Sequence, residues 1–173
     1  MNSKVVAMVR WHKLTELARN NFKGVPKCPG VYFIRVPRPI GRLGGRDKCG
    51  ILYVGEGASL RARIKAFWDS ITLKSKIRHT AAKTYMICRV YEVVKPEELE
   101  VAWVELESKE KANTQEWAAF NLYAQKFKEP PPLNLELRRE TFARAGLSKV
   151  GISYVAPKPI PKIEELLKEV GTF

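Results

Sequence analysis

Side chains of three types in this chain could together hydrolyse a phosphodiester: phenols such as Tyr32 and Tyr53, guanidinium groups such as Arg63, and carboxylates such as Glu116. This reaction requires a proton acceptor for the attacking water, positive charge beside the pentacoordinate phosphorane, and neutralisation of the departing oxyanion. Tyrosine, arginine and a divalent metal held by a carboxylate can supply the three. The four residues span about 85 positions, so the elements that carry them must bring them together.

Other kinds of chemistry have weaker support in the sequence. The cysteines and histidines are Cys28, Cys49, Cys88, His12 and His79, with no CxxC pair and no Cys/His zinc spacing. We therefore interpret the thiols as reduced packing residues. The glycine-rich segment 41–45 lacks the GK[ST] ending of a phosphate-binding loop, and no Ser-His-Asp signature is visible. Nucleotide hydrolysis is not expected.

The charge is strongly asymmetric along the chain. Residues 1–83 carry 18 basic and 4 acidic residues, a net charge of +14, whereas residues 84–173 carry 13 basic and 14 acidic residues. A basic surface of this kind attracts polyanions, most often nucleic acid, and less often an anionic membrane or an acidic protein. A basic protein that is merely soluble remains the simpler alternative.

The first half of the chain predicts a hairpin followed by a helix. Residues 31–36 and 51–54 are rich in β-branched and aromatic residues, which indicates two strands, with the basic Gly/Pro-rich segment 37–50 as a long loop between them. Gly55-Glu56-Gly57 is expected to break the second strand. Ser59 can cap a helix over about 60–70, whose apolar residues Leu60, Ile64, Phe67 and Trp68 form one stripe.

Further elements are predicted on either side of this unit. A helix is expected over about 9–22, a third strand over 84–94 and a helix over 114–127, with the prolines 130–132 ending it. Residues 96–111 fit either a short strand or a helix. In the tail we expect a helical piece over 138–145, a strand candidate over 151–155, a proline hinge over 157–161 and a final helix over 163–170.

The order of these residues and elements resembles the GIY-YIG nuclease superfamily. The match consists of Gly30-Val31-Tyr32, Tyr53-Val54-Gly55, Arg63 ten residues after Tyr53, Glu116 on a later helix, and Pro132-Leu133-Asn134. It covers about residues 29–134. The resemblance implies an α+β fold, a small antiparallel sheet of three or more strands flanked by helices. Residues 1–28 and 135–173 would then be N- and C-terminal helical extensions.

The resemblance also implies roles for the matching residues. Tyr53 takes the proton of the attacking water, Tyr32 assists or positions, Arg63 contacts the phosphate, and Glu116 binds one Mg²⁺ or Mn²⁺, with Asn134 buttressing the site. Because an unperturbed tyrosine has a pKa near 10, Tyr53 would need positive charge or metal-bound water nearby to act as a base.

Each residue also has an ordinary structural interpretation. Tyr32 and Tyr53 could simply pack across a hairpin, and Arg63 could be a solvated helix charge. Asn113 to Glu116 fits a helix capping box, although Glu116 projects near the apolar stripe of its helix, where a carboxylate needs a cation or donors. Asn134 is a common turn residue.

Two positions depart from the family pattern. Many members have lysine after YIG, where this chain has Glu56, and tyrosine or histidine four residues after the arginine, where it has Phe67. We interpret Phe67 as a packing residue, with His79 or Tyr85 as replacements for the missing polar group if the fold brings either near. Glu56 could bind metal, pair with Arg61 or repel a phosphate.

Basic side chains on and after the hairpin are expected to contact phosphates without reading bases. They are Arg35, Arg38, Arg42, Arg46, Lys48, Arg61, Lys65, Lys74, Lys76 and Arg78, with Lys83 beyond. The segment 37–50 is the part most suited to entering a groove. About six phosphate contacts predict that log K falls with log salt at a slope near −5.

Three functions therefore remain open. The first is a metal-dependent endonuclease acting on double-stranded DNA, of restriction or repair type, with the flanking segments giving homodimerisation or target choice. The second is a module on the same fold that binds nucleic acid without cutting it. The third is a basic scaffold or toxin-like module that binds an acidic protein. No apolar run approaches the length of a membrane span and no secretory signal is visible, so a cytoplasmic location is expected.

Overall fold

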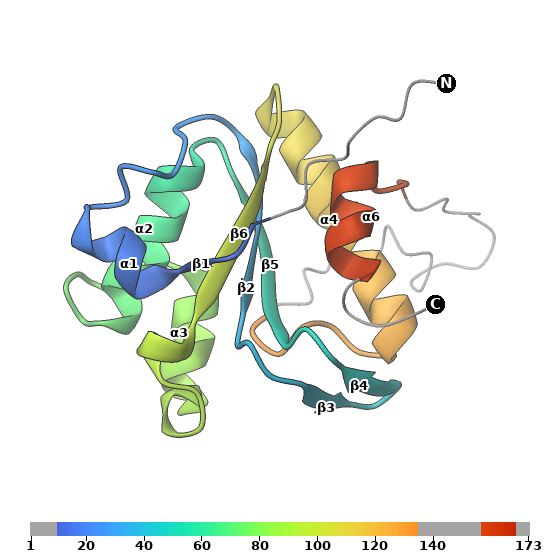
Figure 1. Ribbon diagram of the computed structural model, residues 1–173, viewed down its shortest axis with the longest axis horizontal. Helices are drawn as coiled ribbons and strands as arrows, with labels where there is room; N and C mark the ends of the chain where they lie inside the picture. The colour runs from blue at the N-terminus through green and yellow to red at the C-terminus, as the bar shows by residue number, and fades with distance from the viewer. Residues whose placement is uncertain (1–9, 135–156, 169–173) are drawn as a thin grey trace.

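The computed structural model describes residues 10–134 and 157–168, which form an α+β fold with two antiparallel sheets (Figure 1). The larger sheet has the strand order β1-β6-β2-β5, and every neighbouring pair in it is antiparallel. Its strands are β1 (His12–Lys13), β6 (Glu100–Glu105), β2 (Gly30–Arg35) and β5 (Ile51–Gly57). The smaller sheet pairs β3 (Ile40–Arg42) with β4 (Gly45–Asp47).

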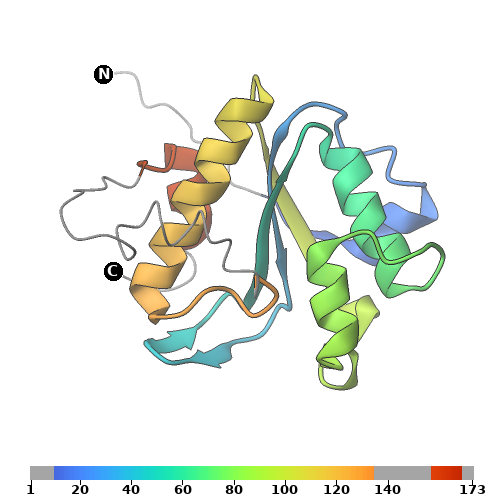
Figure 2. The same cartoon turned by 180° about the vertical axis from the view of Figure 1, so that it is seen from behind.

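Helices cover both faces of the larger sheet (Figures 1 and 2). One face carries α1 (Leu14–Arg19), α2 (Leu60–Ile71) and α3 (Thr80–Ile87), and the other carries α4 (Lys109–Phe127) and α6 (Pro161–Lys168). Two short 3-10 turns, η1 (Val90–Glu92) and η2 (Pro96–Glu98), lead from α3 to β6. Because strand side chains alternate between faces, each face has a separate apolar cluster.

The hairpin and first long helix agree with the sequence prediction. β2 and β5 pair directly as the two arms of a hairpin. The Ser59 side chain caps α2 by accepting a hydrogen bond from the Ala62 amide, and the whole predicted stripe of this helix is buried. The predicted end of the second strand at Val54 is wrong, because residues 55–57 remain paired with β2. The segment 37–50, predicted as a loop, contains the β3–β4 hairpin.

The predicted third strand over 84–94 is wrong. The chain instead forms α3 and η1 there, because Ala81, Ala82 and Tyr85 lie on one helical face that is buried in the cluster containing α2. Tertiary packing thus outweighs the strand propensity of the Tyr-Met-Ile-Cys run. The next strand along the chain is β6, within the segment 96–111, for which the sequence fitted either a strand or a helix. It is an inner strand of the larger sheet, between β1 and β2.

Helix boundaries differ from prediction at both ends of the chain. The helix predicted over 9–22 is only α1, since His12 and Lys13 pair with β6. α4 begins five residues before Thr114, with Ser108 accepting a hydrogen bond from the Lys111 amide. The last helix begins at Pro161, a position that suits proline because the first helical amide has no acceptor. The predictions for 138–145 and 151–155 lie outside the described residues.

Among the described residues, the structure has no helix long and apolar enough to cross a membrane.

Candidate functional site

The two tyrosines lie on neighbouring strands and face the same side of the sheet. In the β2–β5 register, Tyr32 lies opposite Gly55 and Ile34 opposite Tyr53, which places the two ring centroids 5.8 Å apart. A Cβ at Gly55 would overlap Tyr53 Cε1 and lie 2.9 Å from Tyr32 Oη. Glycine at this position therefore makes room for the two phenols.

His79 joins this pair from the turn before α3. Its Nε2 lies 2.5 Å from Tyr32 Oη, and its ring makes edge contacts with Tyr53 and Phe67 at centroid distances of 5.5 and 5.3 Å. His79 was one of two candidates for the missing polar group. The other, Tyr85, donates its hydroxyl to the Val94 carbonyl at 2.6 Å. Only His79 contacts the phenols among these two candidates.

Burial keeps the imidazole and the inner phenol uncharged at neutral pH. Burial, reinforced by the nearby Arg63 guanidinium, lowers the pKa of His79 to about 3. Burial also raises the pKa of Tyr32 well above its ordinary value, as does Tyr53, whereas Arg63 opposes this rise. Tyr53 retains slight exposure, 6% against 0% for Tyr32. Tyr53 is therefore slightly the more exposed of the two tyrosines.

Arg63 lies on the first turns of α2, half-buried beside the phenols. A Cβ at Gly57 would overlap Arg63 Cγ, so glycine lets the arginine side chain pass over the end of β5. The guanidinium acts electrostatically on both Tyr32 and His79. Its side chain makes no ion pair or hydrogen bond within residues 10–134 and 157–168. A positive charge placed in this way favours binding of an anion.

Glu116 lies inside α4 and is half-buried. The predicted capping box at Asn113 is wrong, because α4 has already begun at Lys109. The Glu116 carboxylate interacts electrostatically with Tyr32 and raises the pKa of that phenol. Within the described part of the chain, no group of three or more His, Cys, Asp or Glu side chains could hold a metal ion. Mg²⁺ sites in proteins commonly use one or two carboxylates together with waters and substrate phosphates.

Asn134 supports β5 from outside the sheet. Its side chain accepts a hydrogen bond from the Val54 amide at 2.9 Å and donates one to the Val54 carbonyl at 2.8 Å. The Leu133 amide donates to the Leu52 carbonyl at 2.8 Å. β5 is an edge strand, so these bonds satisfy backbone groups that have no neighbouring strand. They hold the strand that carries Tyr53.

The ten predicted phosphate-binding residues fall into two groups. The first group is engaged with protein partners: Arg35 with Glu100, Arg38 with Glu98, Arg42 with Glu129, Arg61 with the carbonyls of Lys23 and Val25, and Lys65 with Asp69. The second group is exposed and makes no ion pair with any described residue: Arg46, Lys48, Lys74, Lys76 and Arg78. These five charges are therefore available to a polyanion.

The two positions that depart from the family pattern have ordinary protein partners. Glu56 forms an ion pair with Lys109 at the start of α4, rather than with Arg61. Phe67 is fully buried against His79, as expected of a packing residue.

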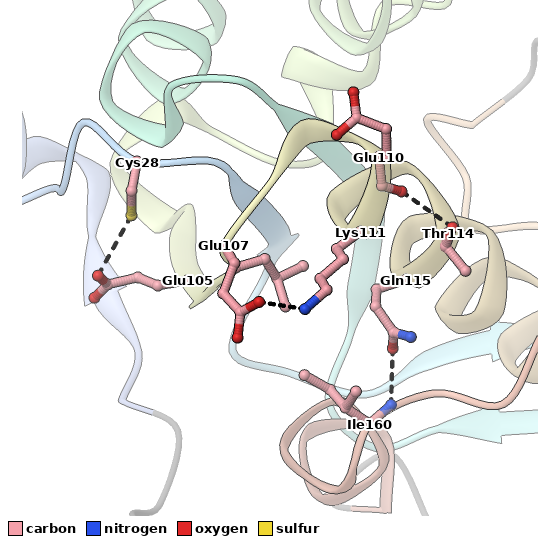
Figure 3. A pocket seen from close by; sticks show the side chains of 9 residues that line it. Cys28, Glu105, Glu107, Glu110, Lys111, Thr114, Gln115 and Ile160 are labelled. Carbon is pink, nitrogen blue, oxygen red and sulfur yellow. Dashed lines mark hydrogen bonds and ion pairs between the residues drawn. The ribbon is translucent and has the colours of Figure 1, made fainter.

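A pocket of about 740 Å³ lies away from the tyrosines, between the end of β6 and the start of α4 (Figure 3). The Cys28 thiol donates to Glu105 at 3.4 Å, and Glu107 pairs with Lys111 (Figure 3). Burial and the Glu105 carboxylate raise the pKa of Cys28, so its thiol stays protonated and weakly nucleophilic. None of the predicted catalytic residues lines this pocket.

Sequence reasoning missed one buried polar pair, Asp47 and Tyr123. The Tyr123 hydroxyl donates to Asp47 Oδ2 at 2.9 Å on the opposite face of the sheet from Tyr32. Asp47 is the single acidic residue in the segment 37–50, and this isolation was the available signal.

Comparison with protein-family models, with curated proteins and with solved structures finds no match to this chain.

Proposed function

We propose that this protein is a metal-dependent endonuclease of the GIY-YIG type that hydrolyses phosphodiester bonds of DNA. The observation that carries the proposal is the pair of tyrosines, Tyr32 and Tyr53, whose ring centroids lie 5.8 Å apart. Arg63 of α2 and Glu116 of α4 both act electrostatically on Tyr32. A half-buried arginine that makes no ion pair with a described residue is costly in a core and is suited to binding an anion.

The residues would divide the work as follows. The Arg63 guanidinium binds the scissile phosphate and stabilises the charge that develops in the transition state. Tyr53, the more exposed phenol, meets the attacking water and accepts its proton in the ionised form. Tyr32 stays protonated and holds Tyr53 in place.

Glu116 would hold the divalent ion, Mg²⁺ or Mn²⁺, which supplies charge neutralisation at the departing oxygen. His79 acts as a positioning residue, since its Nε2 fixes the orientation of the Tyr32 hydroxyl. In many family members the corresponding polar residue lies four positions after the arginine, whereas His79 lies in the turn before α3. Asn134 secures the strand of Tyr53 through Val54.

Exposed cations on two separate segments support a polyanionic substrate, and the one we propose is double-stranded DNA. Arg46 and Lys48 belong to or follow the β3–β4 hairpin, and Lys74, Lys76 and Arg78 lie between α2 and α3. With Lys83, which is also exposed, six cations could contact phosphates. The expected slope of log K against log salt is therefore about −5. A slope near zero would contradict phosphate-based binding.

A second candidate is a protein that binds DNA without cutting it. It is favoured by Phe67, which cannot exchange a proton and stands where many family members have a polar residue. Under this alternative His79 is only a packing partner of Tyr32.

Incubation with supercoiled plasmid separates the two candidates. We expect nicking with Mg²⁺, none with EDTA, and none in the Glu116→Ala and Tyr53→Phe variants. Glu110→Ala, an exposed carboxylate on the same helix, and Tyr91→Phe, a phenol outside the site, are matched controls and should cut normally. A mobility shift without nicking under every condition, including Mn²⁺, would favour the binding-only protein.

A further inference from the structure

The segment between α2 and α3, residues 72–78, combines exposed cations with exposed aliphatic side chains. Leu73 is 69% exposed and Ile77 42% exposed, and Lys74, Lys76 and Arg78 alternate with them and are exposed as well. The segment projects from the body of the molecule in both views (Figures 1 and 2). We name it the basic-aliphatic loop.

Leu73 is unfavourable in this loop for two reasons. Its φ of 58° lies in the left-handed region, immediately after the C-cap residue Thr72, where helices commonly place glycine. Its side chain is also mostly in water, so it recovers little hydrophobic free energy in the isolated protein. A leucine that costs stability on both counts suits contact with something outside this chain.

The loop is bonded to the end of α2 and leads directly into the candidate site. The Lys74 amide donates to the Asp69 carbonyl at 2.8 Å, and the Arg78 amide donates to the hydroxyl of the buried Ser70 at 3.4 Å. The residue after Arg78 is His79, which contacts Tyr32. DNA held by the loop would therefore lie close to the phenols.

We propose that the basic-aliphatic loop recognises DNA in which bases are already unstacked, such as a bulge or a junction of single and double strands. This inference rests on the proposed function. Its cations would bind phosphates, and Leu73 and Ile77 would pack on open base faces. In a continuous duplex those faces are stacked and must be opened at a cost in free energy, whereas at a bulge the opening has already occurred.

Binding measured in EDTA by fluorescence anisotropy tests the inference without cleavage. The probes are a short duplex and the same duplex with a few unpaired nucleotides in one strand. We expect about tenfold tighter binding to the bulged probe, because the cost of unstacking the bases does not have to be met there. The double variant Leu73→Ser, Ile77→Ser should lose this preference and keep its affinity for the continuous duplex.

Val93→Ser is the matched control, because Val93 is 70% exposed but lies outside the loop, and it should keep the preference. Leu73→Gly should raise Tm by about 2–4 °C, because glycine adopts the left-handed conformation without strain. The same variant should weaken the preference for the bulged probe over the continuous duplex.

Equal wild-type binding to both probes, or a preference that survives the double variant, would overturn the inference and leave the nuclease proposal standing. Failure to bind either probe would overturn both.

Discussion

Two buried tyrosines on opposite faces of one sheet have very different surroundings. Tyr123 bonds to Asp47 on the face of α4, and Tyr32 bonds to His79 on the face of α2 and α3. Both hydroxyls are removed from water, and both use a titratable partner. The clusters differ in how completely their polar atoms are satisfied.

Every oxygen of the Asp47 carboxylate has donors. Oδ1 accepts from the amides of Cys49 and Gly50 at 2.9 and 3.0 Å, and Oδ2 accepts from the Ile51 amide at 2.8 Å and from Tyr123. Burial raises the pKa of Asp47, and these hydrogen bonds oppose that rise. The cluster closes the turn between β4 and β5 and leaves no capacity for a ligand.

The Tyr32 cluster is incomplete by comparison. His79 Nδ1 is buried without a hydrogen-bond partner, and Arg63 makes no ion pair within the described residues. Unsatisfied polar groups cost folding free energy. The contrast teaches that a saturated network fixes a structure, whereas an unsaturated one retains binding capacity at a cost in stability.

The largest expected difference between the clusters is in catalysis. Arg63→Ala should lower the plasmid nicking rate about 10²–10³-fold, because it removes the charge that stabilises the transition state. Tyr123→Phe should leave the rate of folded protein unchanged. A rate for Arg63→Ala close to that of wild type, with circular dichroism confirming the fold, would remove Arg63 from the proposed mechanism.

The free energy of unfolding, unlike the nicking rate, should depend strongly on the Asp47 cluster. Asp47→Ala leaves three backbone amides and the Tyr123 hydroxyl without their acceptor, so we expect a loss of about 3 kcal/mol in the free energy of unfolding. Urea denaturation measures this loss, and nicking by the folded fraction should be normal. Unchanged urea stability would show that the saturated cluster has no structural role.

The space between the phenols can be tested with one methyl group. Gly55→Ala should cost about 1–3 kcal/mol by overpacking Tyr53 and Tyr32, and should also slow nicking. Gly24→Ala is the matched control, since nothing lies near its added Cβ. Thermal unfolding compares the two. Equal Tm values would mean that the phenols can move aside freely.

Lowering the pH should change the free energy of unfolding in opposite directions through His79 and through Asp47. The pKa of His79 falls from 6.5 to about 3 on folding, mainly through burial, so the unfolded chain binds more protons between these values. The free energy of unfolding should therefore decrease as the pH drops below 6.5, by up to about 1.4 kcal/mol per unit. Burial raises the pKa of Asp47 above its ordinary value of 3.8. Just above pH 3.8 the folded protein therefore binds more protons than the unfolded chain, and Asp47 makes the free energy of unfolding increase as the pH falls.

Urea titrations at several pH values separate these two contributions. His79→Gln should flatten the acid loss, whereas Asp47→Asn should make it steeper, because it removes a group that opposes the loss. Identical pH profiles for both variants and wild type would refute the assignment of neutral His79.

Local patterns predicted the parts of the fold that depend on neighbours in sequence. A run rich in β-branched and aromatic residues located β2, and apolar spacing with the Ser59 cap located α2. The region 84–94 was mispredicted because Tyr85 becomes buried against α2, which lies earlier in the chain. The role of His12 and Lys13 as a strand also depends on β6, nearly ninety residues later.

For the candidate site too, sequence patterns selected residues, and contacts between distant segments decided which of them meet. Family-like spacing selected Tyr32, Tyr53, Arg63 and Glu116, but His79 was one of two open choices until the turn before α3 was placed. The basic residues were indistinguishable in sequence. Their separation into engaged and available groups depended on acidic partners such as Glu98, Glu100 and Glu129, which lie far along the chain.

The sequence by itself determined the chemical inventory: the excess of positive charge in the first half, the two phenols, and the glycines that leave space around them. Only the tertiary structure decided which of these groups meet. The physical reason is that strand register and helix docking set the face on which each side chain lies, and a shift of one residue in β5 would turn Tyr53 away from Tyr32.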